Sequence, residues 1–144
     1  MSTWIIVGHR AGARIIEHSR SGLKLVSETE HAAGRLKDAE MKSDRPGRTT
    51  SSTGTARSAY SPNETAHDHA AQTFASELAQ TLKAARNDHR VDRLVLVAEP
   101  RFLGMLRGAL DGPTAALVHD EVHKDLANVP LHDLQDHLRD VSFL

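Results

Sequence analysis

Short, separate runs of apolar residues predict the elements in the first part of the chain. Two runs flank a polar, glycine-containing turn in TWIIVGHRAGARIIEHS. β-Branched residues around such a turn are typical of a hairpin, so we expect strands at residues 4–7 and 14–17. In GLKLVSETEH (residues 22–31) two leucines alternate with polar residues. This alternation predicts a third, half-buried strand at an edge of the sheet.

A long amphipathic helix is predicted over residues 61–89, SPNETAHDHAAQTFASELAQTLKAARNDH. Its apolar stripe recurs every four residues and is widened by small side chains. The stripe consists of Ala70, Phe74, Leu78 and Leu82, with Ala71, Ala75, Ala79 and Ala85 beside them. Ser61 and Glu64 have the spacing of a capping box, and Pro62 suits the first helical position. Small alanines on this face favour close packing against a sheet.

Strands and helices alternate in the second half of the chain. DRLVLVAE (residues 92–99) is a continuous apolar run, typical of a strand buried on both faces. PRFLGMLRGAL (residues 100–110) has a helical stripe. TAALVHDEVHKD (residues 114–125) predicts a further strand. NVPLHDLQDHLRDVSFL (residues 128–144) predicts a terminal helix capped by Asn128.

The order of these elements predicts an α/β fold with a mixed sheet. The elements follow as βββ-αβαβα, and a long polar loop at residues 34–60 separates the third strand from the first helix. Strands that alternate with helices after a meander indicate a sheet of mixed direction. The order matches the ribonuclease-H-like topology. We expect a single domain over residues 1–144, with a flexible loop at 34–60.

Composition excludes several classes of protein. The chain has no cysteine, which excludes disulfides, a thiolate nucleophile and Cys-ligated zinc. No apolar stretch is long enough to span a bilayer, and the N-terminus lacks the pattern of a signal peptide. We therefore expect a cytoplasmic protein without a membrane contact. The formal net charge of −1 gives no global attraction to polyanions.

Motifs for catalysis are missing from the sequence. A ribonuclease-H-like nuclease needs converging carboxylates, but the first strand carries no acid, and Glu17 and Glu99 are the nearest strand-terminal candidates. Both are explained as solvated strand ends. The chain has no G-x-S-x-G elbow and no glycine-rich phosphate loop. Gly104 and Gly108 instead predict a close-packing helix face, and we expect no catalytic residue, while a hydrolase that uses histidines and a metal stays an alternative.

Ten histidines pose the question of a metal site. His67 and His69 are two apart on the predicted helix and do not share a face. The other close pairs are His119 with His123 and His132 with His137. No spacing among them matches a known zinc motif. Surface histidines explain the pattern better than a metal site, so we expect no metal and no cofactor, while a histidine acting as a general base stays open.

The central loop holds the candidate binding site. Its residues are Asp44, Arg45, Pro46, Gly47, Arg48, Arg57 and Tyr60. Asp44 and the Pro-Gly pair favour a tight turn with an arginine on either side. Three arginines without an acid between them suit the recognition of phosphate or carboxylate groups, and Tyr60 can stack on a base. Arginines that only keep a loop soluble explain the pattern equally well.

Three stretches carry a resemblance to a known family. They are TWIIVGHRAGARIIE (residues 3–17), SDRPGR (residues 43–48) and DRLVLVAEPRFLGMLRGAL (residues 92–110). Together they resemble the bacterial host attachment protein family over nearly the whole chain. That family is similar in turn to bacterial relatives of the archaeo-eukaryotic peptide release factors, through their ribonuclease-H-like middle domain. Release factors carry Gly-Gly-Gln in a loop before a long helix, a tripeptide that this chain lacks.

The loop and the resemblance together predict a non-catalytic module associated with RNA or the ribosome. Arg45, Arg48 and Arg57 would then contact phosphates. The alternative is a protein-interaction module that acts indirectly in attachment to host cells. In that case the loop would order against a protein partner or a second copy of the chain.

Overall fold

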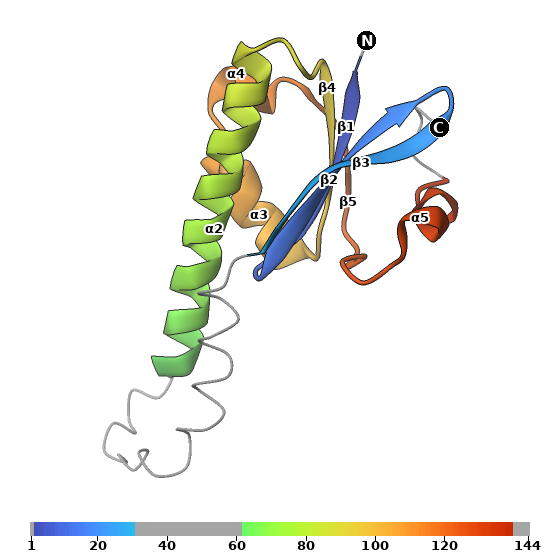
Figure 1. Cartoon of the computed structure of the whole chain (residues 1–144). Coiled ribbons are helices and arrows are strands. Elements are labelled where there is room, and N and C mark those ends of the chain that lie inside the picture. Colours follow the sequence, from blue (N-terminus) through green and yellow to red (C-terminus); the bar gives the residue numbers. More distant parts are fainter. Residues whose placement is uncertain (1, 31–61, 140–144) are drawn as a thin grey trace.

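The computed structural model describes residues 2–30 and 62–139 of the 144-residue chain. The elements are β1 (Thr3–His9), β2 (Gly12–Ser19), β3 (Gly22–Glu30), α2 (Pro62–Asn87), β4 (Arg93–Val97), α3 (Pro100–Ala109), α4 (Gly112–Ala115), β5 (Val118–Val122) and α5 (Leu131–His137). The five strands form one mixed sheet in the order β3-β2-β1-β4-β5 (Figure 1). The prediction of an α/β fold with a mixed sheet is therefore confirmed.

The expected element order βββ-αβαβα is wrong at one point, because α4 stands between α3 and β5. The sequence predicts one strand over residues 114–125, but Thr114 lies in α4 and the strand occupies only Val118–Val122. Asp111 explains the difference, since its carboxylate accepts the Thr114 N–H and caps the short helix. A proline in the first turn of α4 completes this start signal.

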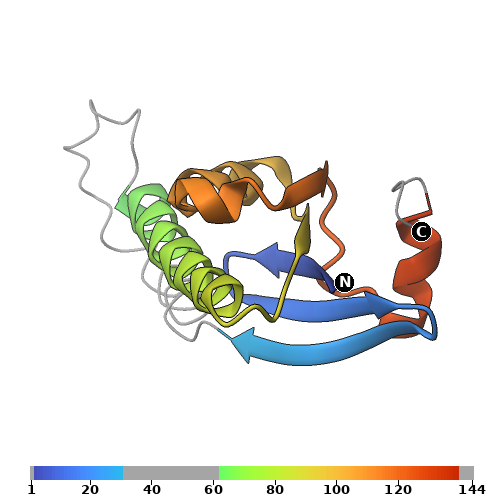
Figure 2. The ribbon, with the colours of Figure 1, turned by 90° about the horizontal axis from the view of Figure 1, so that it is seen from above.

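Two hydrophobic cores lie on opposite faces of the sheet. Helices α2 and α3 cover one face and α5 covers the other (Figure 2). Alternation along β1 divides its side chains between them, with Trp4 and Ile6 in the first core and Ile5 and Val7 in the second. Strand β4 contributes side chains to both cores and is therefore buried on both faces, as its continuous apolar run predicts.

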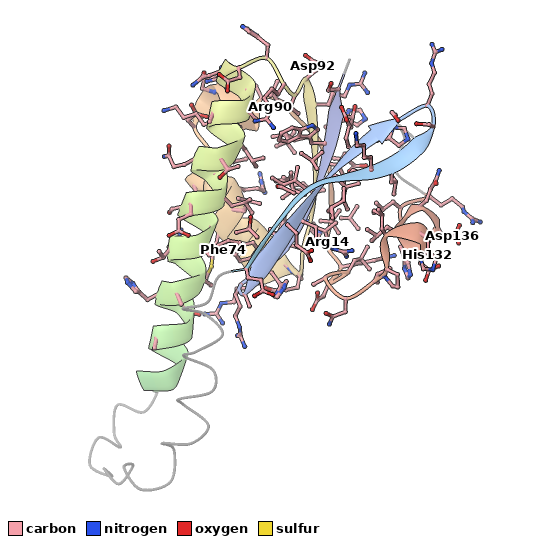
Figure 3. The ribbon with its side chains drawn as sticks, in the orientation of Figure 1. Arg14, Phe74, Arg90, Asp92, His132 and Asp136 are labelled. Atoms are coloured by element: carbon pink, nitrogen blue, oxygen red, sulfur yellow. The ribbon has the colours of Figure 1, made fainter. Side chains whose placement is uncertain are left out.

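Helix α2 buries the predicted stripe and begins at the predicted proline. All eight residues of the stripe are at most 5% exposed. Phe74 of this stripe, labelled in Figure 3, lies on the side of α2 that faces the sheet. Its ring stacks on Phe102 of α3, with 5.9 Å between the ring centroids. The helix starts at Pro62, while Ser61 of the predicted capping box lies outside the described residues. No helix of the described ranges is long and apolar enough to cross a membrane.

Strand β3 forms an edge of the sheet, as predicted, and it is irregular. Ile15 of β2 pairs with Ser27 and Ile16 pairs with Leu25, so Val26 is an extra residue in the edge strand. Such a bulge bends the strand and locally increases its twist. Among the described residues, Leu25 of this strand is the large apolar side chain that lies on the surface, and it is 42% exposed.

Two further predictions are wrong, and two concern residues without a described structure. A Cβ built on Gly104 or Gly108 meets nothing within 4 Å, so both glycines face open space rather than a packed neighbour. Helix α5 follows Pro130 and ends at His137, so Asn128 is not its cap. The flexible loop at 34–60 and the chain from residue 140 lie outside the described residues.

Three polar side chains, Arg86, Asp111 and Thr114, connect α4 to the end of α2. Arg86 Nε donates to the hydroxyl of Thr114 at 3.1 Å, and an Arg86 nitrogen lies 3.7 Å from the Asp111 carboxylate. Thr114 is fully buried, so the hydrogen bond from Arg86 satisfies an otherwise costly hydroxyl. The hydrogen bond with the Thr114 side chain is the largest cause that lowers the pKa of Asp111. The Thr114 N–H and the charges of Arg86 and Lys83 lower it further, against a smaller opposing effect of burial.

We expect Asp111→Asn to lower the melting temperature at neutral pH and to have little effect well below pH 3.8. A carboxyl group with a lowered folded-state pKa stabilises the fold above its unfolded pKa, here 3.8. That stabilisation is lost as the pH falls through the folded-state pKa. Trp4, the single tryptophan, is buried, and its fluorescence during heating gives the melting temperature at each pH. Asp88→Asn removes the same charge from an exposed position, and an identical pH profile for both variants would contradict this prediction.

Candidate functional site

The carboxyl ends of the parallel strands β1 and β4 lie side by side at one end of the sheet, the lower end in Figure 1. Strand β3 also ends there, because Glu30 pairs with Gly12, which pairs with His9 at the end of β1. We call this region the carboxyl edge, and it comprises His9, Arg10, Glu30, Asp68, Glu99 and Arg101. In open α/β sheets, ligands bind outside the carboxyl ends of the strands. The carboxyl edge is therefore the place to look for a site.

The predicted site residues lie outside the described residues. They are Asp44, Arg45, Pro46, Gly47, Arg48, Arg57 and Tyr60. Glu30 at the end of β3 and Pro62 at the start of α2 are the described residues that flank this segment. Strand β3 ends at the carboxyl edge, and the ion pair of Asp68 with Arg101 joins α2 to α3 there, whereas the first turns of α2 extend beyond the sheet (Figure 1). A contact made by the loop arginines stays a prediction.

Glu99 caps α3 at the carboxyl edge. Its Oε1 accepts the Phe102 N–H at 2.7 Å and its Oε2 accepts the Arg101 N–H at 3.0 Å. A carboxylate at a helix N-terminus also interacts favourably with the helix dipole. The sequence carries the signal for this role, because an acid precedes Pro100 at the point where the apolar strand ends. Glu99 is thus more than the solvated strand end that sequence reasoning suggests.

An ion pair between Arg101 and Asp68 joins the start of α3 to the early part of α2. The side chains are 61% and 42% exposed, so the pair contributes at most about 1 kcal/mol to stability. The pair marks the place where the early part of α2 lies beside the start of α3, which directly follows β4. Sequence reasoning missed this pair because the partners are far apart in the chain.

The described carboxylates and histidines do not form a catalytic metal site. Glu17 pairs with Trp4 and therefore lies level with Leu94, five residues before Glu99 along the strand direction. At 3.3 Å a residue, the two acids are roughly 16 Å apart. His123 Nε2 lies 3.6 Å from one Glu121 oxygen, and the other Glu121 oxygen pairs with Arg107 at 2.8 Å. Within residues 2–30 and 62–139, no group of three or more His, Asp or Glu could hold a metal ion.

A recess of about 230 Å³ opens at the carboxyl edge, on the face of the sheet that α5 covers. Two rows of side chains run across strands β1, β2 and β3 and line it. The rows are Val7–Arg14–Glu28 and His9–Gly12–Glu30. Ala127 and Asn128 line it from the connection between β5 and α5. The recess therefore combines residues from four separate parts of the chain.

Gly12 creates space in this recess. A Cβ at this position would lie 2.8 Å from the backbone oxygen of Thr29 and 3.6 Å from His9 Nε2. His9 Nδ1 accepts the N–H of Ala11 at 3.3 Å, so Nε2 carries the proton in the neutral ring. A side chain at position 12 would push β2 and β3 apart, so only glycine keeps both the strand pairing and the space.

Arg14 ties the sheet to the connection that precedes α5. Its Nη2 donates to the backbone oxygen of Leu126 at 2.9 Å. Arg14 lies toward the lower end of the sheet in Figure 3, next to the carboxyl edge. The hydrogen bond fixes residues 126–128 over the recess, and it satisfies one of the five donors of the guanidinium group.

Comparison with known proteins assigns the chain to a family. No curated protein matches the chain. One family model, described as "Protein required for attachment to host cells", matches residues 4–138 and thus covers β1 to α5. The match extends over nearly all of the 144 residues, so the chain belongs to the host attachment family.

Proposed function

We propose that this member of the host attachment family is a non-catalytic binding module that associates with RNA, and with the ribosome in particular, at its carboxyl edge. The observation that carries the proposal is that Glu30, the last described residue before the arginine-containing segment, ends β3 at this edge. Guanidinium groups held beside a sheet edge suit the recognition of phosphates. Arg45, Arg48 and Arg57 supply them in this proposal.

Exposed cations of the described residues support the choice of this edge. Arg10 occupies the turn between β1 and β2, and Arg101 begins α3. Both guanidinium groups belong to the carboxyl edge. Asp68 reduces the charge of Arg101 through their ion pair, so phosphate contacts are assigned to the loop arginines first.

The ribonuclease-H-like topology and the similarity to release-factor relatives belong to the same proposal. Antiparallel pairing of β3 with β2 and of β2 with β1, followed by parallel pairing of β1 with β4 and of β4 with β5, supports this topology. Peptidyl-tRNA hydrolysis is not proposed, because the sequence has no Gly-Gly-Gln. A single domain over residues 1–144 that acts in the cytoplasm stays part of the prediction.

We expect the protein to co-sediment with ribosomes at low salt and to dissociate at moderate salt. A variant with Arg45, Arg48 and Arg57 replaced by alanine should lose this association. Three phosphate contacts to single-stranded RNA contribute a slope of about 2 in the logarithmic dependence of binding on salt. Fluorescence titration of a labelled RNA at several salt concentrations measures that slope.

A matched control distinguishes a specific contact from net charge. Replacing Arg20, Lys24 and Arg139 by alanine removes three exposed positive charges that lie outside the carboxyl edge. Both triple variants change the formal net charge from −1 to −4, because each loses three positive charges. Equal loss of binding in the two variants, or no sedimentation of the unmodified protein at either salt, would disprove the proposed contact.

A protein-interaction module acting in attachment to host cells is the second candidate, and the family description favours it. In this case the segment binds a protein partner or a second copy of the chain. Sedimentation velocity separates a dimer from a monomer directly. A dimer that the arginine variant disrupts, together with absence of ribosome binding, would favour this function over the first.

A further inference from the structure

We propose that residues 124–139, which we call the strap, open from the sheet as one unit while the other elements stay folded. The strap follows β5, at one edge of the sheet, and contains α5, which contacts β3 at the opposite edge (Figure 2). One segment of the chain therefore crosses the whole α5 face of the sheet. The proposal does not depend on RNA binding, since it concerns only described residues on this face.

The division of the molecule into two cores allows the strap to open alone. The core beneath α2 and α3 contains no strap residue among those that the structure describes, so it stays complete when the strap leaves. The core on the other face is built from the sheet and the strap, which contributes Leu126, Leu134 and Leu138. Opening therefore uncovers one face of the sheet and leaves the packing of α2 and α3 unchanged.

Polar contacts join the strap to the rest of the described structure at a single point. The hydrogen bonds and ion pairs of its described residues connect strap residues with one another, with one exception. The exception is the hydrogen bond of 2.9 Å from Arg14 Nη2 to the Leu126 carbonyl. We call this hydrogen bond the latch, because it is the polar contact that must break when the strap opens.

The strap is held more weakly than the rest of the fold. Ordering it costs backbone entropy at every residue, and three buried leucines with the latch offset that cost. Helix α5 adds little of its own, because it has seven residues and no side-chain cap. Segments of this kind open with a lower free energy than the whole molecule.

Opening changes what the α5 face presents to the solvent. The sheet side chains that lose their cover are Ile5, Val7, Ile16, Val95 and Val97. The recess also loses one wall, because Ala127 and Asn128 of the strap border it in the closed state. The strap therefore controls access both to this apolar face and to the recess.

Hydrogen exchange of the full chain, followed by nuclear magnetic resonance, tests the proposal. The reporters in the strap are the N–H groups of Val129, Asp133 and Leu138, which bond to carbonyls of the strap. The reporter of the sheet is the Leu94 N–H, which bonds to the Leu117 carbonyl at 2.8 Å. We expect the three strap groups to share one protection factor, at least about tenfold below that of Leu94. Equal protection of all four groups would show that the strap opens only with the whole fold, and would overturn the proposal.

Removing the latch tests whether the strap opens as one unit. Arg14→Met keeps the apolar stem and removes the donor, so it should lower the protection of the three strap groups by one common factor, about five- to tenfold. Arg20→Met is the matched control, because it removes the same charge from an exposed position and should leave the strap unchanged. Should Arg14→Met fail to fold, Leu126→Ala provides the same test, with an expected common factor of about tenfold or more. Unequal changes among the three groups, or no change, would contradict a single unit.

A substitution in the other core tests whether the strap opens independently. Phe102→Leu weakens the packing beneath α2 and α3, where no described strap residue lies. It should lower the protection of the Leu94 N–H, which exchanges through global unfolding, and leave the strap groups unchanged, because opening the strap breaks no contact of Phe102. An equal fall at Leu94 and in the strap would overturn the proposal.

Discussion

Replacing Phe102 by alanine is expected to lower the free energy of unfolding by about 3–5 kcal/mol. Phe102 is 1% exposed and stacks on Phe74 of α2. Its ring also reaches β1, since a Cβ on Gly8 would lie 3.2 Å from Phe102 Cε2. One side chain therefore fills the point where α2, α3 and β1 meet. The cavity left by alanine has rigid walls on three sides and cannot collapse fully.

Urea denaturation followed by Trp4 fluorescence measures this loss. Trp4 faces the same core as Phe102, so its signal follows the unfolding of this part of the molecule. Typical domains have 5–15 kcal/mol of stability, so the variant should lose a large share of it. Phe102→Leu keeps most of the apolar contact and should lose clearly less. A loss below about 1 kcal/mol for the alanine variant would show that the ring is not essential to this junction.

Replacing Leu134 by alanine is the second large effect, with an expected loss of about 2–5 kcal/mol. Leu134 is fully buried against the sheet face that lacks α2 and α3. Helix α5 has seven residues and no side-chain cap, so it depends on this packing rather than on its own propensity. Loss of one anchor should release the helix before the rest of the fold unfolds.

Hydrogen exchange distinguishes local release of α5 from global unfolding. The Leu138 N–H bonds to the Leu134 carbonyl at 3.0 Å, and its exchange should accelerate strongly in the Leu134→Ala variant. Trp4 fluorescence should change less, since Trp4 lies on the other face of the sheet. Leu131→Ala removes a partly buried side chain from the same helix and should have a smaller effect. Equal effects of both variants would contradict an anchoring role of Leu134.

Periodicity alone predicts the elements in which one face, or the whole strand, is apolar. The four-residue spacing of the α2 stripe and the continuous apolar run of β4 identify both elements and their burial. The start of α4 was not predicted, because Asp111-Gly112-Pro113 signals both the end of one helix and the beginning of the next. The exposure of Gly104 and Gly108 depends on which neighbours α3 has, and the spacing of glycines does not encode that.

The candidate sites differ in how much local sequence reveals of them. The arginines near the Pro-Gly turn are visible as a cluster in the sequence, although they lie outside the described residues. The recess is invisible in the sequence, because it requires the register that aligns His9, Gly12 and Glu30 across three strands. A shift of one residue in that register would turn Glu28 and Glu30 to the opposite face. The geometry of the sheet therefore decides whether these acids line the recess.

The irregular edge strand β3 has a consequence for the behaviour of the protein at high concentration. A regular, apolar strand at an edge is a template on which other molecules can add strands and grow fibrils. Here Val26 interrupts the regular spacing of backbone groups, and Glu28 and Glu30 would bring like charges together between added chains. Edge-to-edge aggregation is therefore disfavoured along this side of the sheet. The same carboxylates that line the recess thus help to keep the protein in solution.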